Sequence, residues 1–143
     1  MTGKSSGALL LLMALGVGGV VPPLAAASLA AAQNAPLELA YGPAPLQKLD
    51  HYRPAATPSP APAQGSPLVV FVHGGAWNAG DKANATGKEK TDHFLAQGYA
   101  FASLNYRLVP SCTVEEQAED VASALAFLLA HAGELGFDSN RVV

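Results

Sequence analysis

The chain has 143 residues, of which half are hydrophobic and 13% are charged, and its formal net charge is −3. This composition excludes a highly charged, disordered chain, and the single cysteine excludes a disulfide framework. With 8 basic and 11 acidic side chains there is no basic stripe to neutralise phosphates, so we expect no nucleic-acid partner. By length the chain forms one domain at most.

Residues 1–32 carry the pattern of a secretory signal peptide. A positive charge at Lys4 precedes a 14-residue apolar run, which a proline pair ends, and small residues follow. A membrane span needs about 20 apolar residues, so the run predicts cleavage, near Ala27 or Ala32, and an exported (periplasmic or secreted) mature chain of residues 33–143. Membrane contact is then transient. An uncleaved membrane anchor is the alternative.

The first mature segments read as two strands and a connection. Alternating apolar and polar residues over 37–41 predict a half-buried strand, which Gly42-Pro43 ends. Residues 47–53 predict a second, more polar strand. Five prolines within residues 54–67 then indicate an extended, solvated connection inside the same domain.

The middle of the chain alternates strands and a helix. Residues 68–72 are continuously apolar and predict a strand buried on both faces, as in parallel sheets. A polar loop over 78–90 leads to a short helix predicted for 91–97, with Gly98 as its C-cap. Residues 99–104 predict another buried strand.

The clearest helix begins at a capping box formed by Thr113 and Glu116. Gly136 is its expected C-cap, residues 138–140 a turn, and 141–143 the start of a strand. The apolar residues at helical spacing predict its buried face: Val114, Ala118, Val121, Ala122, Leu125, Leu128, Leu129 and Ala132. Strands that alternate with helices predict an α/β fold with a mostly parallel sheet and helices on both faces.

A glycine loop, His73-Gly74-Gly75-Ala76-Trp77, follows the apolar strand. Glycines let a backbone approach a ligand closely, and fixed backbone N–H groups can stabilise the negative oxygen of a tetrahedral intermediate. Strand and loop together resemble the oxyanion loop of α/β-hydrolases of the esterase and lipase type. Segments in the same order extend the resemblance over residues 37–143: 49–54, Gly80-Asp81-Lys82, Gly98-Tyr99, Asn105-Tyr106-Arg107-Leu108, Glu119-Asp120-Val121 and 136–142.

The resemblance implies a serine hydrolase of carboxylic esters, of which residues 33–143 form the N-terminal half of the sheet. The backbone N–H groups of Gly74, Gly75 and Ala76 would bind the oxyanion, with those of Gly75 and Ala76 as the expected pair. In this fold the triad runs Ser, then Asp or Glu, then His, later in the chain. His73 is therefore expected to brace the loop by hydrogen bonding.

Three further residues near the loop have expected roles. Trp77 either lines the acyl or alcohol pocket or packs over the sheet edge. Tyr106 and Arg107 follow the end of a strand, where α/β folds bind ligands, and are expected to brace that region or line the pocket. Asp120 is the suggested partner of Arg107. The scattered histidines have no metal-ligand spacing, so the sequence predicts no metal and no cofactor.

The predicted mature chain, residues 33–143, contains no Gly-x-Ser-x-Gly, the nucleophile elbow of this fold. We therefore expect an N-terminal fragment of a longer hydrolase, inactive alone, whose partner is a small-molecule ester. An arylformamide hydrolase or a peptidase of the same fold is the alternative chemistry. A non-catalytic binding protein on a hydrolase scaffold is a further alternative, and an unrelated α/β domain whose glycine loop holds an anion ranks last.

Overall fold

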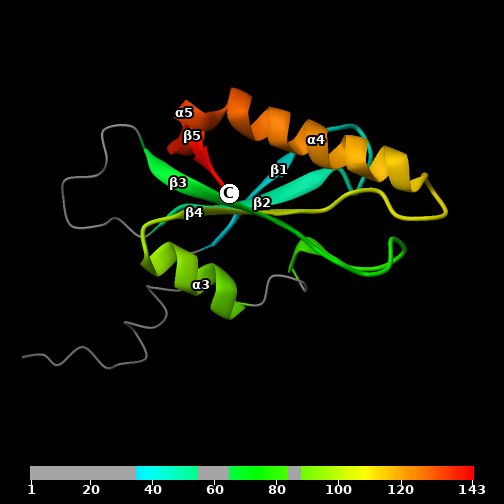
Figure 1. Ribbon diagram of the computed structural model, residues 1–143, viewed down its shortest axis with the longest axis horizontal. Coiled ribbons are helices and arrows are strands. Elements are labelled where there is room, and N and C mark those ends of the chain that lie inside the picture. Colours follow the sequence, from blue (N-terminus) through cyan, green and yellow to red (C-terminus); the bar gives the residue numbers. More distant parts are fainter. Residues whose placement is uncertain (1–34, 55–64, 84–87) are drawn as a thin grey trace, which may run out of the picture.

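The computed structural model describes residues 35–54, 65–83 and 88–143. The predicted signal peptide lies outside these residues, as does most of the proline-rich connection. The elements, in chain order, are β1 (Leu37–Ala40), β2 (Lys48–Tyr52), β3 (Ser66–Val72), α3 (Lys88–Ala96), β4 (Ala100–Leu104), α4 (Val114–Ala130), α5 (Ala132–Leu135) and β5 (Phe137–Val142) (Figure 1). Within the described ranges, no helix is both long and apolar enough to cross a membrane.

The strands form one five-stranded sheet in the order β1-β2-β4-β3-β5. β1 and β2 are antiparallel, as are β2 and β4, whereas β3 runs parallel to both β4 and β5. Helices α4 and α5 cover one face of the sheet and α3 covers the other (Figure 1). The α/β class and the two helical layers are confirmed. The sheet is mixed: β2 runs antiparallel to both of its neighbours, whereas β1, β3, β4 and β5 all point the same way, as expected of a mostly parallel sheet.

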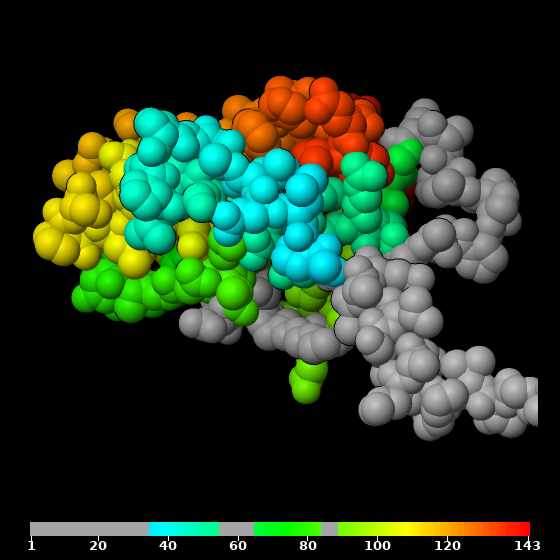
Figure 2. All heavy atoms as spheres, turned by 180° about the vertical axis from the view of Figure 1, so that it is seen from behind, coloured from blue at the N-terminus to red at the C-terminus, as the bar shows by residue number. Residues whose placement is uncertain are grey.

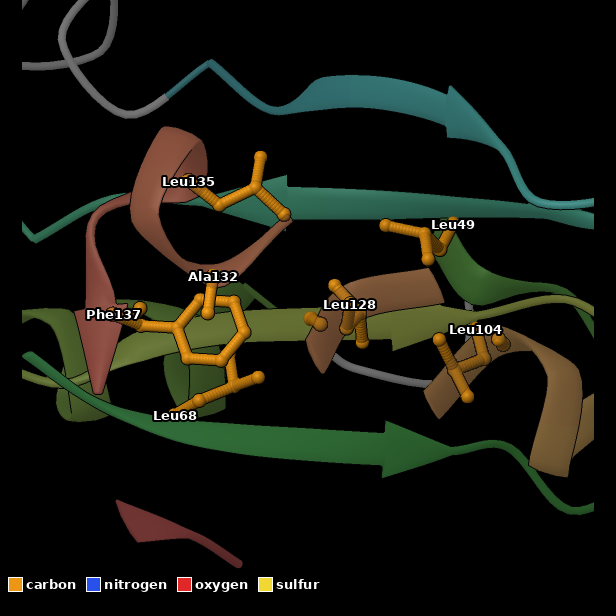
Figure 3. Packing of buried hydrophobic residues seen from close by; sticks show 10 residues of the cluster. Leu49, Leu68, Leu104, Leu128, Ala132, Leu135 and Phe137 are labelled. Atoms are coloured by element: carbon orange, nitrogen blue, oxygen red, sulfur yellow. The ribbon is translucent and has the colours of Figure 1, made fainter. Parts of the chain in front are cut away.

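The core lies between the sheet and α4 with α5 (Figure 3). Leu49, Leu68 and Leu104 come from three adjacent strands and are fully buried against Leu128 of α4. Phe137 of β5 closes the same cluster. Burial of each such side chain contributes about 2 kcal/mol, so this layer fixes the strand ends that carry the loops.

The most deeply buried strand is β4, not β3. All five residues of β4 are buried, because β2 and β3 flank it on either side and helices cover both of its faces. In β3 only Leu68 is buried to that degree, and Val72 at its end is 42% exposed. The expectation that 68–72 is buried on both faces was wrong.

The buried face of α4 differs from the apolar stripe expected from the sequence. Gln117, Asp120, Ala124 and Leu128 are buried, whereas Leu125 and Leu129 are 36% and 40% exposed. The helix is thus turned by roughly a quarter of a turn from the prediction. Two polar side chains point inward because partners outside the helix hold them, a feature that hydrophobic periodicity cannot register.

The boundaries at the C-terminal end also differ from expectation. The capping box of Thr113 and Glu116 is present, but the helix breaks at His131, and Gly136 caps the short α5 with a left-handed φ of 79°. Residues 138–140 lie inside β5 rather than in a turn. The Asp138 side chain still accepts a bond from the Asn140 backbone N–H, the local bond that made this segment resemble a turn. Helix α3 begins three residues earlier than predicted.

His51 makes folding pH-dependent. It is 1% exposed in β2, and neither ring nitrogen has a hydrogen-bond partner among the described residues. Burial, with a smaller effect of Arg53, lowers the pKa of His51 from 6.5 to about 4. The unfolded chain binds this proton more readily. The free energy of unfolding should therefore fall, by about 3 kcal/mol in total, as the pH drops from about 6.5 to about 4.

Urea unfolding followed by circular dichroism across this pH range tests the effect. His51→Leu should remove that part of the pH dependence, and His93→Gln, at an exposed site on α3, should leave it unchanged. Identical pH dependences for wild type and His51→Leu would contradict the assignment.

Candidate functional site

The glycine loop leaves the carboxyl end of β3 and turns through left-handed backbone. Gly75, Ala76 and Trp77 have φ values of 137°, 49° and 70°. The backbone N–H groups of Asn78 and Ala79 both donate to the Gly75 carbonyl, at 3.2 and 3.0 Å, and close the turn. For a residue with a side chain this conformation costs about 1–2 kcal/mol, so other contacts must hold Ala76 and Trp77 in place.

At two positions, one in the loop and one just after it, there is no room for any side chain larger than that of glycine. A Cβ atom at Gly75 would overlap the Ala79 carbonyl, and one at Gly80 would overlap the His73 ring and the Gly74 carbonyl. Gly74 differs, since nothing lies within 4 Å of the position its Cβ would take. The loop is therefore folded back on itself at Gly75 and Gly80, while Gly74 faces open space.

His73 is held inside the loop. It is 3% exposed, its Nδ1 lies 2.9 Å from the Gly74 carbonyl oxygen, and its ring stacks on Tyr106 with centroids 4.5 Å apart. The Tyr106 hydroxyl donates to the His73 carbonyl at 2.7 Å. Burial raises the pKa of Tyr106, which keeps this donor protonated. These contacts lie where the sequence placed bracing roles for His73 and Tyr106.

Three backbone N–H groups of the glycine loop have no hydrogen-bond partner among the described residues. Across residues 35–54, 65–83 and 88–143, nothing accepts a hydrogen bond from the backbone N–H of Gly74, Gly75 or Ala76, and all three residues are exposed. Unpaired N–H groups at the carboxyl end of a parallel strand are available to a ligand oxygen.

A cavity of about 550 Å³ opens beside these donors. Its walls come from the loop, from Tyr106 and from the first turns of α4: Val72, His73, Gly74, Gly75, Ala76, Trp77, Tyr106, Val114, Gln117, Ala118 and Val121. Trp77 is 57% exposed and stands on the cavity wall. Among the described residues, the lining is apolar for the most part and contains no Asp, Glu, Lys or Arg side chain, so it suits an uncharged, apolar group.

Arg107 does not line this cavity but binds Asp120 of α4. Its Nε and Nη2 donate to the two carboxylate oxygens at 2.9 and 2.8 Å, and its backbone N–H donates at 3.0 Å. Gln47 adds a bond of 2.7 Å to the same carboxylate. Burial alone would raise the pKa of Asp120, but the bonds from Arg107 outweigh it and hold the pKa below its ordinary value. The suggested pair is present, in a bracing position.

The sequence analysis did not predict a second group of polar contacts, which residues 81 and 82 make with β2 and with the end of β4. Lys82 Nζ lies 2.7 Å from the Asp50 carboxylate. The backbone N–H of Lys82 donates to the side-chain Oδ1 of Asn105. The Asn105 amide in turn donates to Asp81 at 2.9 Å. These bonds join the segment after the loop to β2 and to the end of β4. Figure 2 shows the green residues of the glycine loop and the yellow residues that follow β4 together at one end of the molecule.

A mixed sheet whose third strand ends in unpaired backbone donors above an apolar cavity is the arrangement of an α/β-hydrolase. The family model described as BD-FAE matches residues 49–143. The chain belongs to this esterase family of the α/β-hydrolase fold.

Curated relatives are esterases. The chain is 30% identical over 106 residues to a probable isoprenylcysteine alpha-carbonyl methylesterase, ICMEL1, of Arabidopsis thaliana, covering 73% of this chain and 20% of that protein. It is 32% identical over 102 residues to esterase LipC of Mycobacterium tuberculosis, covering 71% and 24%. The chain thus spans between a fifth and a quarter of the length of these two relatives.

Solved structures agree on the fold. An esterase of Thermogutta terrifontis, Est2, with butyrate bound, superposes with a TM-score of 0.64 at 26% identity, covering 76% of this chain and 38% of that one. A bifunctional GH43-CE protein of Bacteroides eggerthii gives 0.63 at 27% identity, covering 77% and 15%.

Substitution of the two adjacent glycines should have opposite consequences. Gly75→Ala places a methyl group against the Ala79 carbonyl at a positive φ, and it should lower the free energy of unfolding by about 2 kcal/mol. Gly74→Ala meets open space and should change it by less than about 0.5 kcal/mol. Urea unfolding measures both. Equal effects of the two variants would contradict the turn geometry.

The Arg107–Asp120 pair should be energetically coupled. In a double-mutant cycle of Arg107→Gln, Asp120→Asn and the double variant, we expect a coupling free energy of about 1–3 kcal/mol, because the carboxylate is buried and bound at both oxygens. Thermal or urea unfolding of the four proteins gives this value. Strictly additive losses would show that the pair contributes no mutual stabilisation.

Proposed function

We propose that this chain supplies the oxyanion loop and part of the substrate pocket of an exported serine hydrolase that acts on carboxylic esters. The observation that carries the proposal is the set of unpaired backbone donors at Gly74, Gly75 and Ala76, beside an apolar cavity. Membership of an esterase family and the esterase relatives support it. Export rests on the signal-peptide pattern of residues 1–32.

The proposed chemistry follows from these donors. An ester carbonyl would place its oxygen on the N–H groups of Gly75 and Ala76, which stabilise the charge that develops there as the nucleophile attacks. A preorganised donor of this kind contributes about 3 kcal/mol to transition-state stabilisation. The acyl or alcohol group would occupy the cavity between Trp77 and α4. Est2 has been solved with butyrate bound, which makes a short acyl chain a suitable first probe.

The nucleophile belongs to a part of the hydrolase beyond Val143 in this proposal. The chain spans only 38% of Est2, and residues 33–143 have no Gly-x-Ser-x-Gly. Est2 has also been solved phosphorylated by paraoxon, a reaction typical of an activated nucleophile. A serine that follows β5 would emerge at the same edge of the sheet as the donors, since β5 and β3 are parallel neighbours.

The coding sequence after codon 143 and an ester assay test the proposal together. We expect the frame to continue into a Gly-x-Ser-x-Gly with an acid and a histidine beyond it, and the extended protein to hydrolyse p-nitrophenyl butyrate. The 143-residue chain should show no hydrolysis above the buffer rate. Replacement of the elbow serine by alanine in the extended protein is the matched control.

Two results would contradict the proposal. A purified 143-residue monomer that cleaves the ester would show that no later nucleophile is needed. An extended protein that cleaves an aryl formamide or a peptide but no ester would assign the same loop to amide chemistry.

A further inference from the structure

The carbonyl of Trp77 links the glycine loop to helix α4 and to the segment after β4 through hydrogen bonds. It accepts a hydrogen bond of 2.8 Å from the side-chain Nε2 of Gln117 and one of 3.1 Å from the backbone N–H of Val109. Trp77 is also one of the two residues with a side chain that adopt positive φ in this loop, the other being Ala76. The two bonds therefore act where the backbone is strained.

Gln117 is placed there at a cost to stability. It is 2% exposed on the inner face of α4, and its Oε1 has no hydrogen-bond partner among the described residues. A buried amide with one unpaired oxygen costs more than an apolar side chain of the same size. Packing alone would favour methionine or leucine at this position, so the glutamine is better explained by what its Nε2 does.

The helix presents this amide rigidly. The capping box at Thr113 fixes the start of α4 one turn before Gln117, and the Arg107–Asp120 pair fixes the next turn. Arg107 also lies two residues before Val109, the second donor to the Trp77 carbonyl. The two donors to the Trp77 carbonyl therefore belong to α4 and to the segment before it, and the Arg107–Asp120 pair joins these two elements.

We propose that Gln117 is a positioning residue that holds the oxyanion loop in its left-handed conformation, and so aims the N–H groups of Gly75 and Ala76. That these groups bind an oxyanion rests on the proposed function. The effect of Gln117 on the loop does not, and it can be measured without a substrate.

The experiment is amide hydrogen exchange, by NMR, of the 143-residue chain and its Gln117→Met variant. Methionine keeps the length of the side chain and removes its donor. We expect exchange at Asn78, Ala79 and Val109 to become roughly tenfold faster, with the amides of β4 unchanged and the melting temperature unchanged or higher. Glu119→Gln, on the exposed side of the same helix, is the matched control and should leave the loop unaltered.

A second variant, Gln117→Glu, keeps the size and shape of the side chain and, measured at a pH high enough to ionise its carboxylate, cannot donate to the Trp77 carbonyl. It should accelerate exchange at the same three amides. Unchanged loop exchange in both variants would overturn the proposal. Equal acceleration of the loop and of β4 would also overturn it, because this would be a general loss of stability. Loss of ester hydrolysis in the extended protein bears on the proposed function and is a separate outcome.

Discussion

Left-handed backbone at Ala76 and Trp77 is the constraint on which the candidate site depends. Glycine takes such φ values freely, but alanine and tryptophan do not. The chain uses a glycine at Gly75, where any Cβ atom would strike the Ala79 carbonyl, and accepts strain at the next two positions. Strain of this kind persists only where surrounding contacts over-determine it, so the neighbouring contacts can be understood as the means of holding one turn.

Those contacts come from elements far apart in the sequence. The hydroxyl of Tyr106, which follows β4, donates a hydrogen bond to the His73 carbonyl at the start of the loop. Gln117, from α4, binds the Trp77 carbonyl at the other end. Gly80 brings the returning chain against the His73 ring. The sheet register aligns the ends of β3 and β4, where Val72 lies beside Leu104, so the anchors and the loop meet without any long connection.

The sequence predicted the parts of this arrangement that local pattern encodes. The α/β class, the capping box at Thr113 and the glycine turn follow from periodicity and residue type. The buried face of α4 did not, because Gln117 and Asp120 are polar and are buried only for the sake of Trp77 and Arg107. A strand was expected to start at residue 141, but β5 begins at Phe137; its start was misplaced because Asp138 and Asn140 form a turn-like local bond inside it. Long-range pairing decides such positions, and single-sequence patterns contain no record of it.

No Asp, Glu, Lys or Arg side chain of the described residues lines the cavity. Asp120 is bound to Arg107 and Asp50 to Lys82, and none of these four residues lines the cavity. A carboxylate within the cavity would repel a developing negative oxygen, and any ionised group there would draw water into the space. The same charges, held in pairs, brace the supports of the loop, while the N–H donors lie beside a cavity whose lining is mostly apolar. Under the proposed function, the polar network and the apolar cavity serve one requirement, which is to hold neutral donors rigidly without placing a carboxylate beside them.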